Sequence, residues 1–478
     1  MAYRYFHAIR VCLTAAAVAA PVSGFAQQTQ QQTATTTTAL TQQAAPTVAL
    51  TQQPAAPAPA GIPIKPPVFN RANERLPAWL RVRGEFRERM EGFDGAGFND
   101  TRDDLYWLTR FRLNATVTPS KQLSFQAQVQ DARVAKKTVG PTGAPFKAPF
   151  DLRMAFADIG AATGPVTVRA GRQELVYGEQ RLVGHVSWLN AARTFDGVKA
   201  TFRTKAFSTD VFASSVVRIQ DGEFDKSGNG NRFAGVYGTT AKLIPLATLE
   251  PYVFFRRDVN LRAEAGGLGT LKATTTGVRV AGKLPARLDY GVEMAVQRGS
   301  LATDDVSAWA GHWQLRETFP GRTAVRLTGE YNYASGDEDA TDNVRGTFDQ
   351  LYPTPHDKYG LADQIGWKNV HHARAGFEIT PVRALPVQVN YHSWWLADKN
   401  DAIYTAGSAV LARVANGAAD SHVGQELDFQ VARALAPQLQ VAAGYAHIFT
   451  GKFLKEATPG ASYSHPYVML TYVFLAEK

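Results

Sequence analysis

Hydrophobic and polar residues alternate with a period of two through most of this chain. In residues 80–89, LRVRGEFRER, the alternation puts apolar residues on one face of an extended strand and charged residues, mostly arginines, on the other. A soluble antiparallel strand shows the same alternation, so the pattern is informative only because it recurs as far as Phe474. One face suited to lipid and one to water, repeated along the chain, predict a membrane β-barrel.

Short turns marked by proline or glycine alternate with longer polar connections. The turns lie at Pro119–Ser120, Gly164–Pro165, Pro245, Pro285, Pro320–Gly321, Pro381–Pro386 and Pro437, and the clearest extended segments span 107–117, 123–129, 323–333, 387–395, 425–431 and 468–474. Outer-membrane barrels have this rhythm, because their chain crosses about 25 Å of hydrocarbon twice per hairpin. We therefore predict an all-β fold, a transmembrane antiparallel β-barrel of about 18 strands.

The first 75 residues differ from the rest. A basic start, an apolar run of about ten residues and small residues before Ala26 predict a signal peptide over residues 1–26, since a membrane-spanning helix needs roughly 20 apolar residues. Residues 27–75, rich in Gln, Thr, Ala and Pro, are predicted to form a disordered linker. The barrel domain is then residues 76–478, and the single cysteine, Cys12, belongs to the leader.

The positions of the charges carry more information than the formal net charge of +9, which alone does not indicate nucleic-acid binding. Within 107–117, Arg110 and Arg112 fall on the face opposite the apolar residues, and Arg326 and Glu330 do so within 323–333. In a barrel this face lines the lumen, where guanidinium groups attract anions and bind carboxylates through two hydrogen bonds. Interspersed acidic residues keep such binding weak enough for conduction. The pattern predicts a passive, anion-selective channel without a cofactor.

One segment is more specific than the alternation. GRQELVYGEQRLVG at 171–184 is followed by Trp188, Asn190 and ARTFDG at 192–197. This stretch resembles the alginate export family of outer-membrane barrels, and further similarity lies at 331–367, 424–429 and 444–454, so that it extends over residues 80–474. The residues that carry the motif are Gly171, Arg172, Gln173, Tyr177, Gly178, Gln180, Arg181, Gly184, Trp188, Asn190, Phe195, Asp196 and Gly197.

The resemblance implies a monomeric barrel in the bacterial outer membrane that exports an acidic polysaccharide, an alginate-like polyuronate, past an arginine-rich constriction. Its expected partners are outer-membrane lipid, the anionic polysaccharide and periplasmic export factors, and no nucleic acid. The outer loop Lys136–Pro149 is the gate candidate by position. Arg172 and Arg193 are placed in the constriction by the motif, and strand parity adds the others. The expected lumenal residues are Arg81, Arg83, Arg110, Arg112, Arg133, Arg153, Asp158, Arg172, Glu174, Arg193 and Asp196.

Three alternatives stay open. A general anion-selective porin for small solutes would share every feature of the strands. A hydrolase or lyase would need a catalytic set, but the sequence holds no GxSxG and no HExxH, and His371 and His372 are adjacent and so point to opposite faces of a strand. The acidic segment Asp337–Asn343 is similar to a calcium loop but lacks the glycine and the bidentate glutamate. We expect no catalytic residue and no metal site.

Aromatic residues have two interpretations in a barrel. Trp and Tyr concentrate at both membrane–water boundaries, and a few can face the lumen and stack on sugars. We expect the boundary role for Trp79, Trp107, Trp367, Trp394, Trp395 and Tyr472.

Overall fold

The computed structural model describes residues 72–474, apart from residues 265, 322 and 383–384. The predicted signal peptide and all but the last residues of the predicted linker lie outside this part. Within it, the chain begins with a single helical turn, α2 (Ala72–Arg75), that leads into the first strand. None of the helices in the described ranges is long and apolar enough to cross a bilayer.

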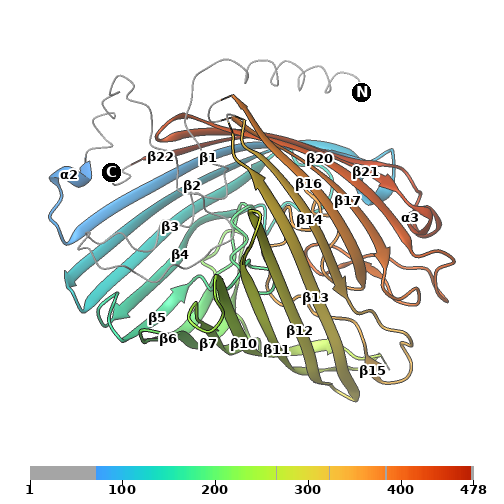
Figure 1. Ribbon diagram of the computed structural model, residues 1–478, viewed down its shortest axis with the longest axis horizontal. Coiled ribbons are helices and arrows are strands. Elements are labelled where there is room, and N and C mark those ends of the chain that lie inside the picture. Colours follow the sequence, from blue (N-terminus) through green and yellow to red (C-terminus); the bar gives the residue numbers. More distant parts are fainter. Residues whose placement is uncertain (1–71, 265, 322, 383–384, 475–478) are drawn as a thin grey trace.

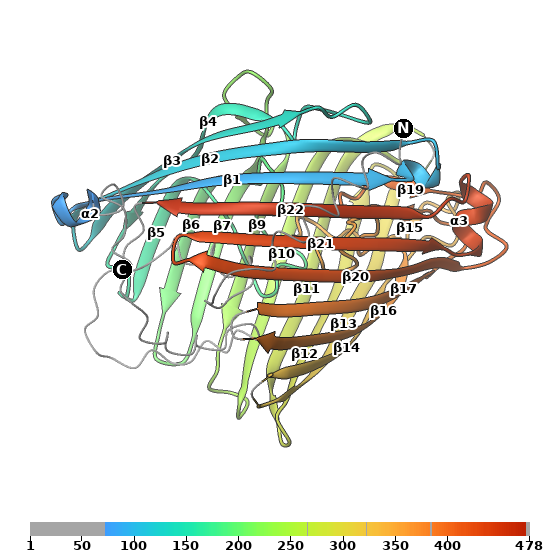
Figure 2. The ribbon, with the colours of Figure 1, turned by 90° about the horizontal axis from the view of Figure 1, so that it is seen from above.

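Eighteen long strands close into an antiparallel barrel (Figures 1 and 2). They are β1 (Leu80–Asp94), β2 (Asp103–Ser120), β3 (Leu123–Ala135), β4 (Ala148–Ile159), β5 (Val166–Gln173), β6 (Phe195–Arg203), β7 (Ser208–Arg218), β9 (Arg232–Thr239), β10 (Ala247–Arg262), β11 (Leu268–Leu284), β12 (Leu288–Leu301), β13 (Asp304–Phe319), β14 (Val325–Ala334), β16 (Val370–Val382), β17 (Leu385–Leu396), β20 (His422–Ala436), β21 (Leu439–Thr450) and β22 (Tyr463–Phe474). The barrel closes where β22 pairs with β1, from Gly84 opposite Phe474 to Asp94 opposite Ser464. The predicted fold class is confirmed.

Long connections gather at one end of the barrel and contain the remaining elements. These are η3 (Ala96–Phe98), β8 (Lys226–Ser227), β15 (Val344–Arg345), β18 (Ile403–Tyr404), β19 (Val410–Ala412) and α3 (Lys452–Ala457). The short turns lie at the other end, which is the periplasmic end in outer-membrane barrels. One of them, residues 204–207, contains neither proline nor glycine, and its backbone is held by hydrogen bonds between Thr204 and Phe207 instead.

The two faces of the strands differ as the alternation predicts. On β13 and β14 the outward side chains between the strand ends are mostly apolar, and Trp309, Leu315 and Leu327 are 41%, 46% and 44% exposed. The side chains between them, such as Gln314 and Glu330, are buried and point inward. An exposed apolar band on the outside and a polar inside suit a barrel surrounded by lipid.

Two of the long connections fold back into the lumen and give the barrel an internal core. We call residues 174–194, between β5 and β6, inward loop A, and residues 335–369, between β14 and β16, inward loop B. Tyr177 of loop A stacks on Tyr237 of β9, with ring centroids 4.6 Å apart, in a buried cluster that also contains Phe212 and Phe254. The inner face of β7, β9 and β10 is therefore aromatic, and it buries the apolar side of loop A.

The two inward loops are joined by backbone hydrogen bonds. Gly184 donates to the carbonyl of Tyr352 (2.8 Å), Tyr352 to that of Leu182 (2.8 Å), and Thr354 to that of Gln180 (2.8 Å). Loops A and B thus form one body inside the barrel.

Two tryptophans expected at the membrane boundary belong to this core. Trp367 of loop B and Trp394 of β17 are both fully buried, and the indole N–H groups donate to the carbonyls of Tyr333 and Tyr359. Trp79 and Trp107 are 50% and 43% exposed, as a boundary position requires. The expectation was wrong for Trp367 and Trp394, because the inward loops offer an apolar site that strand alternation does not reveal.

Candidate functional site

Three arginines of the β1–β2 wall hold inward loop A by its backbone. Arg87 donates to the carbonyls of Ser187 (3.1 Å), Trp188 (3.0 Å) and Leu189 (3.3 Å). Arg110 donates to the carbonyls of Ser187 (2.9 Å) and Leu189 (3.0 Å). Arg89 donates to that of Trp188 (2.6 Å). The arginine-rich face predicted for the lumen is therefore occupied by peptide carbonyls of the chain itself.

Asn190 completes the attachment of this segment. Its amide nitrogen donates to three backbone carbonyls, those of Thr109 (3.1 Å), Arg133 (2.9 Å) and Phe146 (3.0 Å). The side chain is fully buried and so ties loop A to β2, β3 and the connection between β3 and β4 at once. An asparagine at this motif position is explained by these contacts.

A stack of three side chains links the wall to both loops. The guanidinium of Arg89 lies 3.8 Å from the ring centroid of Trp188, and the ring of His356 in loop B stacks on Trp188 with centroids 3.8 Å apart and planes at 7°. His356 in turn lies 2.8 Å from a carboxylate oxygen of Asp363. With these contacts on its ring, Trp188 acts as a structural side chain of the two loops.

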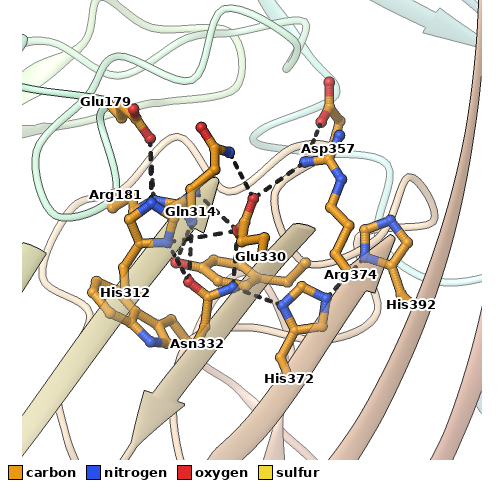
Figure 3. A network of polar contacts seen from close by, with 12 residues as sticks. Glu179, Arg181, His312, Gln314, Glu330, Asn332, Asp357, His372, Arg374 and His392 are labelled. Carbon is orange, nitrogen blue, oxygen red and sulfur yellow. Dashed lines mark hydrogen bonds and ion pairs between the residues drawn. The ribbon is translucent and has the colours of Figure 1, made fainter. Parts of the chain in front are cut away.

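Arg181 of loop A stands at the centre of a buried polar network (Figure 3). Its Nη2 lies 2.9 Å from Glu330 Oε1, and its Nε lies 3.4 Å from Glu179 Oε2. Arg374 of β16 approaches the second oxygen of Glu330 at 3.6 Å. Because Arg181 and Glu330 are 3% and 0% exposed, this pair is shielded from solvent screening and orients loop A strictly.

Histidine rings continue the network across five strands. His312 Nδ1 lies 2.8 Å from Asn332 Oδ1, Asn332 Nδ2 lies 2.8 Å from His372 Nδ1, and His372 Nε2 lies 2.9 Å from His392 Nδ1. His392 Nε2 then lies 3.0 Å from Asp428 Oδ2. Asn332 Nδ2 also donates to the Glu330 carboxylate, so His372 accepts at Nδ1 and donates from Nε2, while His312 donates from Nδ1 to Asn332 Oδ1. Each of these two rings is thereby held in one tautomer. This row of hydrogen-bonded side chains gives the inner wall below the loops a single arrangement of donors and acceptors.

Loop B is docked on the end of this chain. The amide of Leu361 donates to Asp428 (3.2 Å), and the amide of Ala362 donates to the neighbouring Glu426 (3.0 Å). Gly360 between Tyr359 and Leu361 has φ +126°, and a Cβ there would meet the Glu426 carboxylate at 2.7 Å. The turn that presents these amides therefore requires glycine.

Several of the predicted lumenal residues do point inward. The inward ones on strands are Arg81, Arg83, Arg110, Arg112, Arg153 and Asp158. Arg112 donates to Gln130 (2.8 Å), and Arg153 donates to Gln128 (2.6 Å) and binds Glu174 of loop A. Burial raises the pKa of Glu174, but His185 and Arg153 outweigh it and bring the pKa to about 2. Glu174 thus remains a carboxylate that fastens the start of loop A.

Arg193 lies at the end of loop A and also contacts backbone. Its Nη1 donates to the carbonyls of Gly184 (3.2 Å) and Pro353 (2.9 Å). Burial lowers its pKa to about 10. The motif residue joins loop A to loop B.

The predicted position of Arg133 was wrong. It lies opposite Thr109 on the face that carries Trp107 and Phe111, which are 43% and 37% exposed. Its side chain is 67% exposed and pairs with Asp131 at 2.7 Å. Arg133 therefore lies on the outside of the barrel, near the end of β3, where an outward charge costs little.

Arg172 and Asp196 also lie on the outward face. They are opposite each other on β5 and β6 and pair at 2.8 Å, on the face of Val198 and Phe202, which are 50% and 46% exposed. Arg172 further donates to the carbonyl of Asp225 in the connection after β7 (3.0 Å). The placement of these two motif residues in the lumen is corrected, and they hold the rim of the barrel instead.

Some inward charges were not among the predicted residues. Arg169 pairs with the predicted Asp158 (2.7 Å), and Lys199 pairs with Asp210 (3.1 Å). Parity within each strand could have found Arg169, Lys199 and Asp210, as it found Arg326, which pairs with Glu378 (3.2 Å). The lumenal wall thus mixes both signs well beyond β1 and β2.

The structure also places the histidine pair and the acidic segment that the sequence offered as catalytic and calcium-binding alternatives. His371 points outward to the hydroxyl of Tyr331 (2.7 Å), whereas His372 points inward, so the predicted opposite facing is confirmed. In Asp337–Asn343, Asp339 and Asp342 accept backbone amides of the loop itself. Over the described ranges, no group of three or more His, Cys, Asp or Glu residues is placed to hold a metal ion.

Comparison with known families identifies the barrel. The family model described as alginate export matches residues 78–468. The chain belongs to the alginate export family. Family and fold are those of outer-membrane transport channels, and the protein is an outer-membrane channel of this family. No curated protein matches the chain significantly.

Solved structures of Pseudomonas aeruginosa porins share the fold. The outer membrane protein OpdK is 11% identical, with a TM-score of 0.59, and the match covers 83% of this chain and 98% of OpdK. OpdO is 12% identical, with a TM-score of 0.57 and coverage of 83% and 97%. OccK2 (OpdF), solved in complex with glucuronate, is 10% identical, with a TM-score of 0.55 and coverage of 83% and 98%. At these identities the likeness establishes the fold alone.

Proposed function

We propose that this alginate export family member is a passive, anion-selective channel through which an acidic, alginate-like polysaccharide leaves the cell. The observation that carries the proposal is the concentration of inward guanidinium groups on two neighbouring strands. Arg81, Arg83, Arg87, Arg89, Arg110 and Arg112 face the lumen from β1 and β2, and the inward carboxylates on the same strands are Glu85, Glu91 and Asp104. Such a wall attracts anions in a low-dielectric surrounding.

The chemistry of the wall suits a chain of uronate sugars. Each uronate carries one carboxylate, and a guanidinium binds a carboxylate through two hydrogen bonds without changing protonation. Ion pairs such as Arg169–Asp158 provide acceptors among the donors, which keeps each contact weak enough to exchange. The polymer would move by exchanging contacts along the wall, driven by its synthesis or by its gradient. The channel would act as a monomeric barrel together with periplasmic export factors.

A second function is favoured by the inward loops. Loops A and B fill part of the lumen with a packed core and a buried network, and a narrow passage suits single acidic sugars better than a polymer. OccK2 was solved with glucuronate, a single uronate sugar. The alternative is a porin that admits small carboxylates by diffusion.

Planar-bilayer recordings distinguish the two functions. We would measure the reversal potential of the refolded protein in a salt gradient, and then its conductance with monomeric glucuronate, short oligouronates or neutral oligosaccharides of matched length. Anion selectivity with block by oligouronates at lower concentration than by glucuronate supports polysaccharide passage. Equal block by monomer and oligomer supports the porin. Cation selectivity would refute both.

A further inference from the structure

The segment Ser187–Asn190 of loop A occupies the guanidinium groups that the proposed function needs. Its carbonyls at 187, 188 and 189 receive hydrogen bonds from Arg87, Arg89 and Arg110 at 2.6 to 3.3 Å. A substrate carboxylate cannot use the same N–H groups while this segment stays in place. The segment and the substrate therefore compete for one site.

The charges at this site are unevenly balanced. Arg110 pairs with Glu85 (2.6 Å) and Arg89 with Glu91 (2.6 Å). Every hydrogen bond recorded for Arg87 goes to a neutral oxygen of residues 187–190, although its side chain is only 2% exposed. Hydrogen bonds to an ionised partner are roughly twice as strong as those between neutral groups. A carboxylate is thus a better partner for Arg87 than the carbonyls it now holds.

The rest of loop A is fixed by contacts that a carboxylate does not compete for. Toward its start, Tyr177 lies in the aromatic cluster, and Arg181 binds the buried Glu330. Beyond Asn190, Ala191 is buried in a cluster with alanines of β3 and β4, and the amide of Val217 on β7 donates to the carbonyl of Thr194 (3.0 Å). The segment between these attachments is held by the arginines, by Asn190 and by the Trp188–His356 stack. It is the part of loop A that can leave while the remainder stays docked.

We propose that Ser187–Asn190 is a substrate-displaced stopper, in which a carboxylate of the acidic ligand replaces the peptide carbonyls on Arg87 and its neighbours and so releases the segment from the β1–β2 wall. The stopper rests on the proposed function, because an acidic sugar supplies the displacing group. It keeps the channel narrow without substrate and opens it in response to the ligand itself.

A single cysteine reports the displacement. The chain's one cysteine, Cys12, lies in the predicted leader, so Ser187→Cys in the mature barrel gives one reactive thiol. We would measure its modification rate by a charged thiol reagent with oligouronate, with a neutral oligosaccharide and with salt of equal ionic strength. We expect a rise of tenfold or more with oligouronate alone, while Ser120→Cys, at an exposed short turn, reacts at one rate throughout. An unchanged rate at position 187 would overturn the stopper.

Two further variants separate release from ligand capture. Asn190→Ala in the Ser187→Cys background removes three carbonyl contacts, and it should raise the rate without ligand. Arg87→Gln should also raise that rate but abolish the response to oligouronate, and heat-modifiable mobility on gels confirms that each barrel is folded. A full response in Arg87→Gln contradicts the inference.

Block of conductance by oligouronate is recorded on the same preparation. Block without a change at position 187 refutes the stopper and leaves the proposed function standing. If neither occurs, both fail.

Discussion

Replacing Arg181 by methionine tests whether the central network holds loop A in the lumen. Arg181 Nη2 lies 2.9 Å from Glu330 Oε1, and the two side chains are 3% and 0% exposed. Removing one partner of a buried ion pair costs about 3–5 kcal/mol, because the other charge is left without compensation. Arg374 remains 3.6 Å from the second oxygen of Glu330, and Gln314 and Asn332 still donate to this carboxylate. We therefore expect the lower end of the range, about 3 kcal/mol.

This cost is expressed as weaker docking of loop A. Because about 1.4 kcal/mol corresponds to a factor of ten, Arg181→Met should lower the docking equilibrium roughly a hundredfold. Single-channel recordings should show longer and larger openings, and urea unfolding in detergent micelles should report the loss of stability. The double variant Arg181→Met/Glu330→Met removes both charges and should recover most of that stability.

The double-mutant cycle decides whether the reasoning holds. We expect a coupling free energy of at least 1 kcal/mol between positions 181 and 330. If the stability losses of the two single variants sum to the loss of the double variant within about 0.5 kcal/mol, the two charges do not depend on each other and the argument is refuted. Unaltered channel openings in Arg181→Met would refute the link to loop docking.

Three further predictions concern selectivity, pH and packing. Arg169→Ala should reduce anion selectivity in bilayer recordings, whereas Arg133→Ala and Arg172→Ala, on the outward face, should leave the reversal potential unchanged, and the opposite ranking would contradict the assigned faces. Burial and the neighbouring Asp337 and Asp304 raise the pKa of Glu264 to about 7. An unfolded glutamate titrates near 4.3, so this group destabilises the fold as pH rises from about 5 through 7. Glu264→Gln should raise the unfolding temperature at pH 8 but not at pH 4, and an equal shift at both would disprove this assignment. Phe453→Ala in α3, at a fully buried ring, should cost about 3–5 kcal/mol in urea unfolding, and clearly more than Phe449→Ala, whose ring is 53% exposed; equal losses would count against an interior packing role.

The alternation of apolar and polar residues predicted the fold correctly, because the direction of a side chain in a strand follows directly from whether its residue number is odd or even. It assigned Arg110, Arg112, Arg326 and Glu330 to the inside correctly. Parity needs a reference, however, and the rule that apolar residues face outward supplies it. On β6 the rule holds for Val198 and Phe202, which point outward, but it fails for Phe195, which is fully buried against Phe233 and Tyr352 on the inside. Asp196 shares the outward face and had been placed on the wrong one.

The course of the inward loops could not be read from the residues. A tryptophan suits both a membrane boundary and a packed core, so Trp367 and Trp394 carry no local mark of their burial. The motif identified the family and located Arg181, Trp188 and Asn190. Their contacts come from strands far away in the sequence: Glu330 from β14, and Arg87 and Arg89 from β1. Such pairings depend on the closed barrel and have no signal within the loop.

The body formed by loops A and B also bears on how the cylinder is assembled. Loop A grips β1 and β2 through Arg87 and Arg110, while loop B is docked on β20 through the amides of Leu361 and Ala362. These contacts join β1 and β2 to β20 from within, on either side of the β1–β22 junction. Once the two loops meet, the two ends of the sheet are already held near each other, which lowers the entropy lost when the final strand pair forms. The lumenal body thus acts as an internal scaffold for sealing the barrel.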